Sequence, residues 1–376
     1  GHWAYDSINK LAAAGVIEGY GDSTFGGDKL MTRYEMAQIV AKAMAKGANV
    51  DKLAAEFADE LDNLGVRVAN LEKKADNVKI TGEARYRYWD YDRANNKKDT
   101  SKDALRSRIW VTGAINDDWT YKGMLENIQA FQHSDAGEET TKFQRAYVTG
   151  KLGGVAVQAG RYGFTDFTGG NIYDTRMDGA QLAYGKDVKL TVGAGKAADA
   201  AGIKDTDTSV AEDMYYANLG AKLGVVDANV GYYKFTDVAA LKDDDKIWTA
   251  GVAFPVLKDL KLSAVYLKSD VDTYNNKSID DDGYVIGLDY KGAKAGVAGS
   301  YGIFAKYYDQ AAGTFVAHTM EGENFGVAAD GFKGYMVGAN YTFAKNIVGA
   351  VKYFDLEGKK GDDETNTLYA ELNFMF

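Results

Sequence analysis

The sequence contains no cysteine, a single proline and only three histidines among its 376 residues. Without cysteine there are no disulfides and no thiolate metal sites, and the dispersed His2, His133 and His318 form no pattern of nucleophile and base. The 44 basic and 54 acidic side chains give a net charge of −10, which disfavours nucleic acid as a partner. No stretch has the roughly 18 uncharged apolar residues of a transmembrane helix. We therefore expect no enzyme, no cofactor, no metal site and no membrane-spanning helix.

What the sequence has in excess is glycine and tyrosine, with 43 and 26 residues respectively. Tight turns use glycine, and half-buried strands favour aromatic and β-branched residues. The composition therefore favours amphipathic strands joined by tight turns over a helical bundle.

The first region, residues 1–46, predicts two short helices joined by a glycine-rich loop. In the second helix Thr32 and Glu35 have the spacing of a capping box, and an apolar stripe follows them. Arg33 falls in the first turn, where a cation opposes the positive end of the helix dipole. This unfavourable position suggests that Arg33 binds an anion.

The first region resembles a surface-layer homology (SLH) domain, with the landmarks H-W-A, G-V-I-E-G-Y-G-D-S-T-F and T-R-Y-E in the family's order. Members of this family hold proteins on the cell wall by binding wall polysaccharide or peptidoglycan in grooves built by three units. The resemblance places four residues at such a groove: Trp3, Gly21, Thr32 and Arg33. It also implies that the peptidoglycan can bear polyamine groups, for which a carboxylate such as Glu35 or Asp22 would be the partner, whereas Arg33 would meet a carboxylate or phosphate. The alternative is a purely structural cap.

The second region, residues 47–79, has apolar residues at steps of three and four, which is a heptad pattern. The core of this pattern is Val50, Leu53, Phe57, Leu61, Leu64, Val68 and Leu71. A single helix cannot bury such a seam alone, so we expect a coiled-coil stalk formed with other copies of the chain. The alternative is a helix that lies against its own barrel.

The third region, residues 80–376, changes to the period of two that is typical of strands. About sixteen such segments alternate between short connections, such as NDD and GKD, and long polar ones, such as DRANNKKDTSKD. We therefore expect an all-β transmembrane up-and-down barrel of about sixteen antiparallel strands, preceded by the helical SLH domain and the stalk. An even number of strands puts both ends of the barrel on the side of the short turns. The competing fold, a β-sandwich of a wall-anchored surface protein, does not require this alternation of connections.

The last strand tests the barrel prediction independently. Leu368, Ala370, Leu372, Phe374 and Phe376 share one face, and polar residues occupy the other. Lipid requires such an apolar outer face. A terminal phenylalanine after this alternation also resembles the assembly signal of bacterial outer-membrane barrels.

The barrel region resembles trimeric general porins, in which the third long loop folds into the lumen and forms the constriction. Here that loop is residues 164–178, with the carboxylates Asp166, Asp174 and Asp178. Five arginines on the first strands would each cost about 2 to 4 kcal/mol in lipid and must face inward. They are Arg85, Arg87, Arg106, Arg108 and Arg145. We predict that they oppose the loop carboxylates across the constriction; the alternative is a set of ordinary salt bridges that stiffen the loop.

Together the three regions resemble the OmpM-type porins of diderm bacteria related to Gram-positive lineages. This resemblance implies a homotrimer in the outer membrane, surrounded by lipid and lipopolysaccharide, with the SLH domain and stalk in the periplasm. It implies two functions: passive diffusion of small hydrophilic solutes and ions, and tethering of the outer membrane to peptidoglycan. The alternative function is that of a non-conducting structural tether.

Overall fold

The computed structural model divides the chain into two compact units, residues 1–77 and residues 78–376. It describes residues 7, 10–11, 32–63, 77–94, 99–131, 137, 139–198, 210–323 and 325–376.

The first unit is a small helical domain. Its helices are α2 (Arg33–Ala45), α3 (Asp51–Glu56) and α4 (Ala58–Asn63). The stripe Ala37, Val40 and Ala43 on α2 is fully buried against side chains of the two shorter helices. In the described part of the chain, no helix is both long and apolar enough to cross a membrane.

The structure corrects the first half of the predicted stalk. Val50, Leu53, Phe57 and Leu61 are all buried in the core of the helical unit itself. The helix also breaks at Phe57, which ends α3 instead of continuing the heptads. Because α2 already supplies an apolar partner, the seam is covered within one chain. Leu64, Val68 and Leu71 lie outside the described residues.

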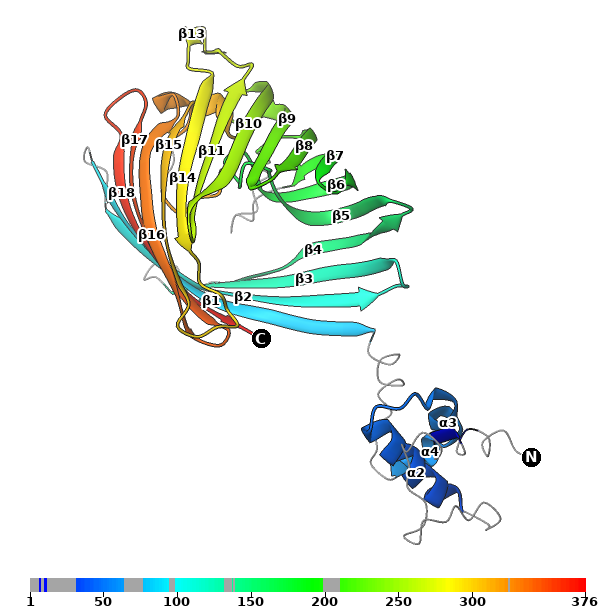
Figure 1. The fold of residues 1–376 in the computed structure, drawn as a ribbon. Helices are drawn as coiled ribbons and strands as arrows, with labels where there is room; N and C mark the ends of the chain where they lie inside the picture. The colour runs from blue at the N-terminus through cyan, green and yellow to red at the C-terminus, as the bar shows by residue number, and fades with distance from the viewer. Residues whose placement is uncertain are drawn as a thin grey trace. The chain divides into compact units, whose positions relative to one another are not determined.

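The second unit is a closed barrel of sixteen antiparallel strands, as predicted (Figure 1). The strands of its first half are β1 (Val78–Arg93), β2 (Thr100–Ala114), β3 (Trp119–Ala130), β4 (Glu139–Leu152), β5 (Val155–Thr165), β6 (Asp174–Gly185), β7 (Val188–Ala198) and β8 (Asp213–Leu223). Those of its second half are β9 (Val226–Val238), β10 (Asp243–Leu257), β11 (Leu260–Ser269), β14 (Asp282–Lys291), β15 (Tyr301–Gln310), β16 (Phe332–Ala344), β17 (Ile347–Gly358) and β18 (Glu364–Met375). A small separate hairpin, β12 (Thr273–Tyr274) and β13 (Lys277–Ser278), lies in the loop after β11.

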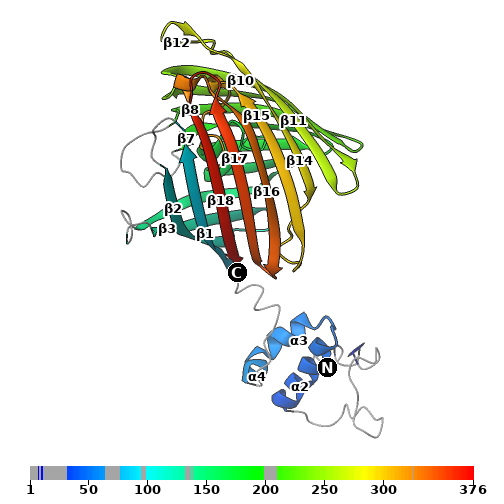
Figure 2. The ribbon, with the colours of Figure 1, turned by 90° about the vertical axis from the view of Figure 1, so that its left-hand side faces the viewer.

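The barrel closes where β1 pairs with β18, which lie side by side in Figure 2. Arg85 is opposite Asn373 in this register, and Gly82 exchanges two backbone hydrogen bonds with Phe376, of 2.7 and 2.9 Å. Both ends of the barrel therefore lie on the side of the short turns, as predicted.

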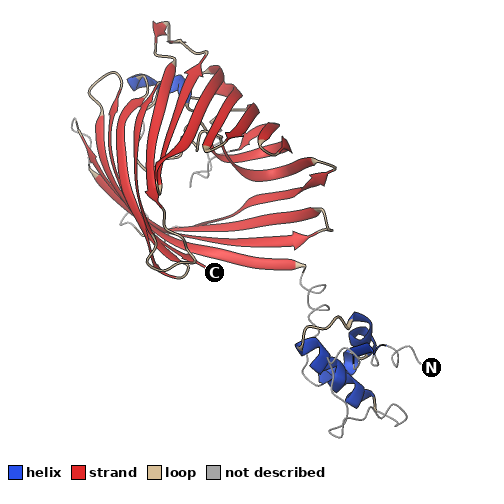
Figure 3. Ribbon diagram, viewed as in Figure 1, coloured by secondary structure: helices blue, strands red, loops and turns tan. Residues whose placement is uncertain are grey.

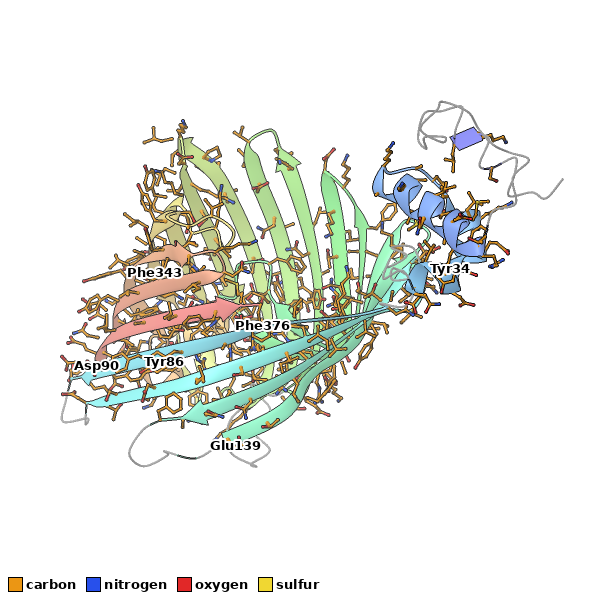
Figure 4. The ribbon with its side chains drawn as sticks, turned by 90° about the horizontal axis from the view of Figure 1, so that it is seen from below. Tyr34, Tyr86, Asp90, Glu139, Phe343 and Phe376 are labelled. Atoms are coloured by element: carbon orange, nitrogen blue, oxygen red, sulfur yellow. The ribbon has the colours of Figure 1, made fainter. Side chains whose placement is uncertain are left out.

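The alternation of faces predicted for the last strand is present in the structure. Leu368 and Phe374 are each 41% exposed and Phe376 is 69% exposed, whereas Tyr369 is 1% exposed. Figure 4 shows the side chains along the wall and labels Phe376 and, on β16, Phe343. On β18, therefore, the outer face is apolar and the inner face carries the polar side chains.

The barrel interior holds two loops, which we name L3 (residues 166–173, between β5 and β6) and L7 (residues 311–331, between β15 and β16). L7 contains two short 3₁₀ helices, η1 (Ala312–Thr314) and η2 (Val327–Ala329), and helices and strands are coloured separately in Figure 3. L3 is shorter than predicted, because β6 begins at Asp174 and not at Gly179.

L3 is packed against the wall formed by β8 and β9. The ring centroid of Phe167 lies 6.1 Å from that of Tyr216, and the ring centroid of Tyr173 lies 5.6 Å from that of Phe235. The hydroxyl of fully buried Tyr233 accepts a 3.0 Å hydrogen bond from the backbone N–H of Phe167. This side of the interior is therefore filled by aromatic side chains.

Candidate functional site: a charged inner wall and a helical head

The five predicted arginines lie on the inner faces of β1, β2 and β4. Arg85 is directly opposite Arg106 in the β1–β2 register, and Arg108 is opposite Glu126 in the β2–β3 register. A β-bulge between β3 and β4 sets the position of Arg145, which pairs with Met124. We call these five side chains the arginine wall. Arg85 and Arg108 keep 26% and 22% of their side-chain surface exposed, so solvent reaches the wall.

Three glutamates stand between these arginines, and the sequence interpretation did not include them in the constriction. Glu83 lies 2.9 Å from Arg106 and 3.3 Å from Arg85, and Glu126 lies 2.6 Å from Arg108. Glu371 is 3.5 Å from Arg85. The signal that would have found them is the same alternation, since Glu83 is two residues before Arg85 on one strand face. The arginines are thus balanced mainly by carboxylates of the wall itself.

Arg87 and Arg145 differ from the other three arginines. Neither makes an ion pair with another described residue; each lies over an indole ring instead, Arg87 at 4.9 Å from the centroid of Trp89 and Arg145 at 5.3 Å from that of Trp110. Cation–π contact orients a guanidinium without neutralising it. These two arginines therefore carry the excess positive charge of the wall.

The structure corrects the predicted role of Asp166. Its side chain is 3% exposed and accepts 2.8 Å hydrogen bonds from the backbone N–H groups of both Ile172 and Tyr173. A third N–H, of Thr168, donates to it at 2.7 Å. A loop of this length must satisfy its own buried donors, and Asp166 does so for L3. It holds the loop together and does not face the arginine wall.

Asp174 and Asp178 also differ from the prediction, because both belong to β6 and not to the loop. Asp178 shares a strand face with the exposed Leu182 and Tyr184, and it binds Arg161 through two hydrogen bonds of 2.5 and 2.6 Å. It therefore points outward, away from the arginine wall. Asp174, the first residue of β6, accepts a 2.5 Å hydrogen bond from Thr165, the last residue of β5.

In the helical unit, the predicted capping box is present. Thr32 is the N-cap of α2; its hydroxyl accepts from the Glu35 N–H at 3.2 Å, and its own N–H donates to the Glu35 carboxylate at 2.8 Å. The hydrogen bonds from Thr32 hold the pKa of Glu35 below its ordinary value. Glu35 therefore acts first as a cap of its own helix.

Arg33 is not a free anion-binding cation in this structure. Its guanidinium is paired with Glu60 at 2.6 Å and with Glu56 at 2.9 Å, and it lies 4.9 Å from the ring centroid of Phe57. The hydrogen bonds from Arg33 lower the pKa of Glu60, and those same carboxylates raise the pKa of Arg33. Two carboxylates thus offset the unfavourable position of the cation in the first turn. Trp3 and Gly21 lie outside the described residues.

Acidic residues in the long loops at 243–245 and 280–282 form ion pairs with lysines. Asp280 lies 3.1 Å from Lys359, and Asp244 lies 3.2 Å from Lys234. Within the described ranges, no group of three or more carboxylate or imidazole side chains is arranged to hold a metal ion.

Comparisons with known proteins agree with both units. Residues 1–37 match the S-layer homology domain. Aligned segments are 40% identical over 89 residues to the outer membrane protein SlpA of Deinococcus radiodurans and 34% identical over 84 residues to the outer membrane protein alpha of Thermotoga maritima. Each alignment covers 20% of this chain, but only 8% and 20% of the respective relative, so the chain spans a small part of the curated relatives' length.

Solved structures resemble the barrel. OprB of Pseudomonas putida has a TM-score of 0.56 at 13% identity, covering 82% of this chain and 96% of that one. OmpF of Salmonella typhi has a TM-score of 0.52 at 12% identity, covering 79% and 97%. At such identities the likeness concerns the fold. The fold is that of a porin-type β-barrel, and the curated relatives are named outer membrane proteins. At its N-terminus this barrel protein carries an SLH domain, as its sequence landmarks predicted.

Proposed function

We propose that the protein is a porin through which small hydrophilic solutes and ions diffuse passively. The observation that carries this proposal is the closed ring of sixteen strands, whose inner face bears the arginine wall in contact with solvent. A ring of this size is too wide to be filled by side chains of the strands alone. The aromatic packing occupies the side of β8 and β9, so the passage runs along the arginine wall.

Single-channel recording in a planar lipid bilayer tests this proposal. We expect stepwise insertion currents from purified, folded protein, each closing in three equal substeps under voltage if three pores insert together. Folded and inserted protein that carries no current would leave the alternative function, a non-conducting structural tether.

We further propose that the SLH domain lies in the periplasm and tethers the outer membrane to peptidoglycan. The support is the N-terminal SLH match together with the position of β1, which enters the barrel on the short-turn side. The ligand class is peptidoglycan, including peptidoglycan that bears polyamine groups. Since Arg33 and Glu35 are engaged within the domain, Trp3 is the sharper test.

Co-sedimentation with purified sacculi measures this tethering. We expect Trp3→Ala to abolish binding of the full-length chain, whereas Trp119→Ala, in the barrel, leaves it unchanged. Sacculi stripped of polyamine decide whether that group is part of the ligand. Equal binding by the Trp3 variant would contradict the tether.

The outer face of the barrel supports a homotrimer. Arg161 lies six residues from Val155, at the short-turn end of β5, and Asp178 lies six residues from Tyr184, at the short-turn end of β6. On β16, by contrast, ten residues separate Phe343, at the short-turn end, from the first outward charge, Lys333. At about 2.5 Å of height per tilted residue, the pair lies roughly 15 Å up an apolar band about 25 Å tall. Lipid would make such charges costly, so we infer that another copy of the chain covers them, while lipid and lipopolysaccharide surround the rest of the wall.

Paired substitutions test this interface. Replacing both Arg161 and Asp178 with alanine should lower the temperature at which the oligomer dissociates in native gels. The matched control removes Lys333 and Glu357, an outward pair 3.1 Å apart on β16 and β17. Equal effects of the two double variants would place the interface elsewhere.

A further inference from the structure

L7 and L3 fold into the barrel from opposite walls. In the ring of sixteen strands, β16 is eight places from β6, and β15 is eight places from β5. L3 connects β5 to β6 and L7 connects β15 to β16, so the two loops can touch only if together they span the width of the barrel. L7 thus reaches across the interior.

The two loops, together with the adjoining strand residues Gln310 of β15 and Asp174 of β6, are joined by backbone hydrogen bonds and one side-chain bond. The donors and acceptors are Gln310 Nε2 to Asn171 O at 3.0 Å, Val316 N and Ala317 N to Ile172 O at 2.9 Å each, Asp174 N to Ala317 O at 2.8 Å, and Thr319 N to Gly170 O at 2.8 Å. A parallel β-bridge links Tyr173 and Ala317. L3 and L7 therefore form one continuous bar across the barrel.

L7 also brings two carboxylates to the inner wall on its own side of the barrel, where β17 and β1 lie one and three places from β16. The Glu321 carboxylate accepts a 2.9 Å hydrogen bond from Lys352, which lies near the centre of β17 on its inner face. The Glu323 carboxylate accepts from Arg93 of β1 at 2.6 Å. Glu321 and Glu323 keep 29% and 34% of their side-chain surface exposed, so solvent reaches both.

We propose that L7 is a second constriction loop and that Glu321 and Glu323 determine the charge selectivity of the pore. The sequence assigned the negative charges of the passage to L3, but Asp166 of L3 accepts hydrogen bonds from the backbone of its own loop. Glu321 and Glu323 supply these negative charges instead. Glu323 balances Arg93 of β1 and Glu321 balances Lys352 of β17, so the two carboxylates keep these cations from attracting anions into the passage. This inference rests on the proposed diffusion function.

The test measures the ratio of anion to cation permeability from reversal potentials in a salt gradient. We expect the double variant Glu321→Gln, Glu323→Gln to raise this ratio by about two-fold or more, because two negative charges leave the passage. Glu357→Gln is the matched control, since it removes the same charge from the outer face and should leave the ratio unchanged.

Chemical restoration of the charge separates selectivity from loop folding. The chain has no cysteine, so Glu321→Cys offers a single thiol to a membrane-impermeant thiosulfonate. A reagent that attaches a sulfonate should return the ratio toward that of the unmodified protein, and one that attaches a trimethylammonium should raise it further. Unchanged ratios with both reagents, while current persists, would overturn the inference but not the porin. Absence of current from the unmodified protein would overturn both.

Discussion

The inner faces of β1–β4 and of β8–β9 obey the same alternation but carry opposite chemistry. The first presents the arginine wall with its interleaved glutamates, and the second presents Tyr216, Tyr233 and Phe235. The difference follows from what each face meets, since the first is reached by solvent and the second is covered by L3. In this barrel, alternation decides which residues point inward, and the loops decide which of them line a passage.

The largest expected effect comes from breaking the aromatic side. Tyr233→Ala removes a fully buried ring and the acceptor of the Phe167 N–H, and we expect it to cost about 3 to 5 kcal/mol of unfolding free energy. L3 would lose this contact with the barrel wall and become mobile, so single-channel currents should become larger and noisier. Urea titration and bilayer recording measure the two effects.

The control for this truncation lies on the opposite wall. Arg85→Ala removes a side chain whose ion pairs are long, 3.3 and 3.5 Å, and which is partly exposed. It should cost about 1 kcal/mol or less. Equal costs for the two variants would mean that the two sides of the interior are not packed differently.

The next effect is on selectivity, from the charge of the arginine wall. Arg145→Ala removes a cation that forms no ion pair with a described carboxylate, so the ratio of anion to cation permeability should fall by about two- to five-fold. Glu126→Gln removes a carboxylate between Arg108 and Gln144 and should move the ratio in the opposite direction. Reversal potentials measure both, and shifts of the same sign would contradict the assignment of these charges to the passage.

A smaller shift should follow when the same arginine is moved and not removed. A methyl group at Gly163 would overlap the guanidinium of Arg145, so Gly163→Ala forces that side chain aside. The permeability ratio should change in the direction of Arg145→Ala, but less. Gly220→Ala on β8, where the nearest atom to the new methyl is 3.9 Å away, should change nothing.

A double variant makes this prediction stricter. If Gly163→Ala acts through Arg145, adding it to Arg145→Ala should have no further effect, since coupled sites are not additive. An additive result would show that the methyl group disturbs the barrel by another route.

The sequence predicted the elements whose signal is local and periodic. The faces of β18, the inward arginines and the capping box of Thr32 and Glu35 each depend on residues within one strand or one turn. The prediction placed Asp178 in the constriction loop only because β6 begins earlier than expected. When the strand is extended back to Asp174, the alternation of faces puts the Asp178 side chain on the outside.

Such local patterns could not predict contacts between residues that are far apart in the sequence. The apolar seam from Val50 to Leu61 was visible, but nothing in its spacing said that α2 would cover it. Asp166 turns inward because L3 must satisfy its own N–H groups, and Glu323 of L7 meets Arg93 of β1, a partner far away in the sequence. A side chain's partner depends on tertiary packing, which periodicity does not encode.

The smallest expected effect extends the comparison from the barrel to the helical unit, where Arg33, unlike Arg145, is paired with two carboxylates. The hydrogen bonds from Arg33 lower the pKa of Glu60. The stability from this pair is therefore fully present above the ordinary glutamate pKa of about 4.3 and is lost as pH falls through the lower folded value. Glu60→Gln should remove it at pH 7.

Hydrogen exchange of the full-length chain, followed on peptides from residues 33–61 and corrected for intrinsic rates, measures this loss. At pH 7 we expect exchange in Glu60→Gln to be faster by about two- to five-fold, the size of an exposed ion pair. Asp62→Asn is the control, because Asp62 lies on the same helix and makes no ion pair with a described residue. The difference between Glu60→Gln and the unmodified protein should shrink as pH is lowered below about 4, because the unmodified protein then loses the same pair. A difference that stays constant with pH would mean that the glutamate stabilises the unit by packing, and that the pairing of Arg33 does not distinguish it from Arg145 in energetic terms.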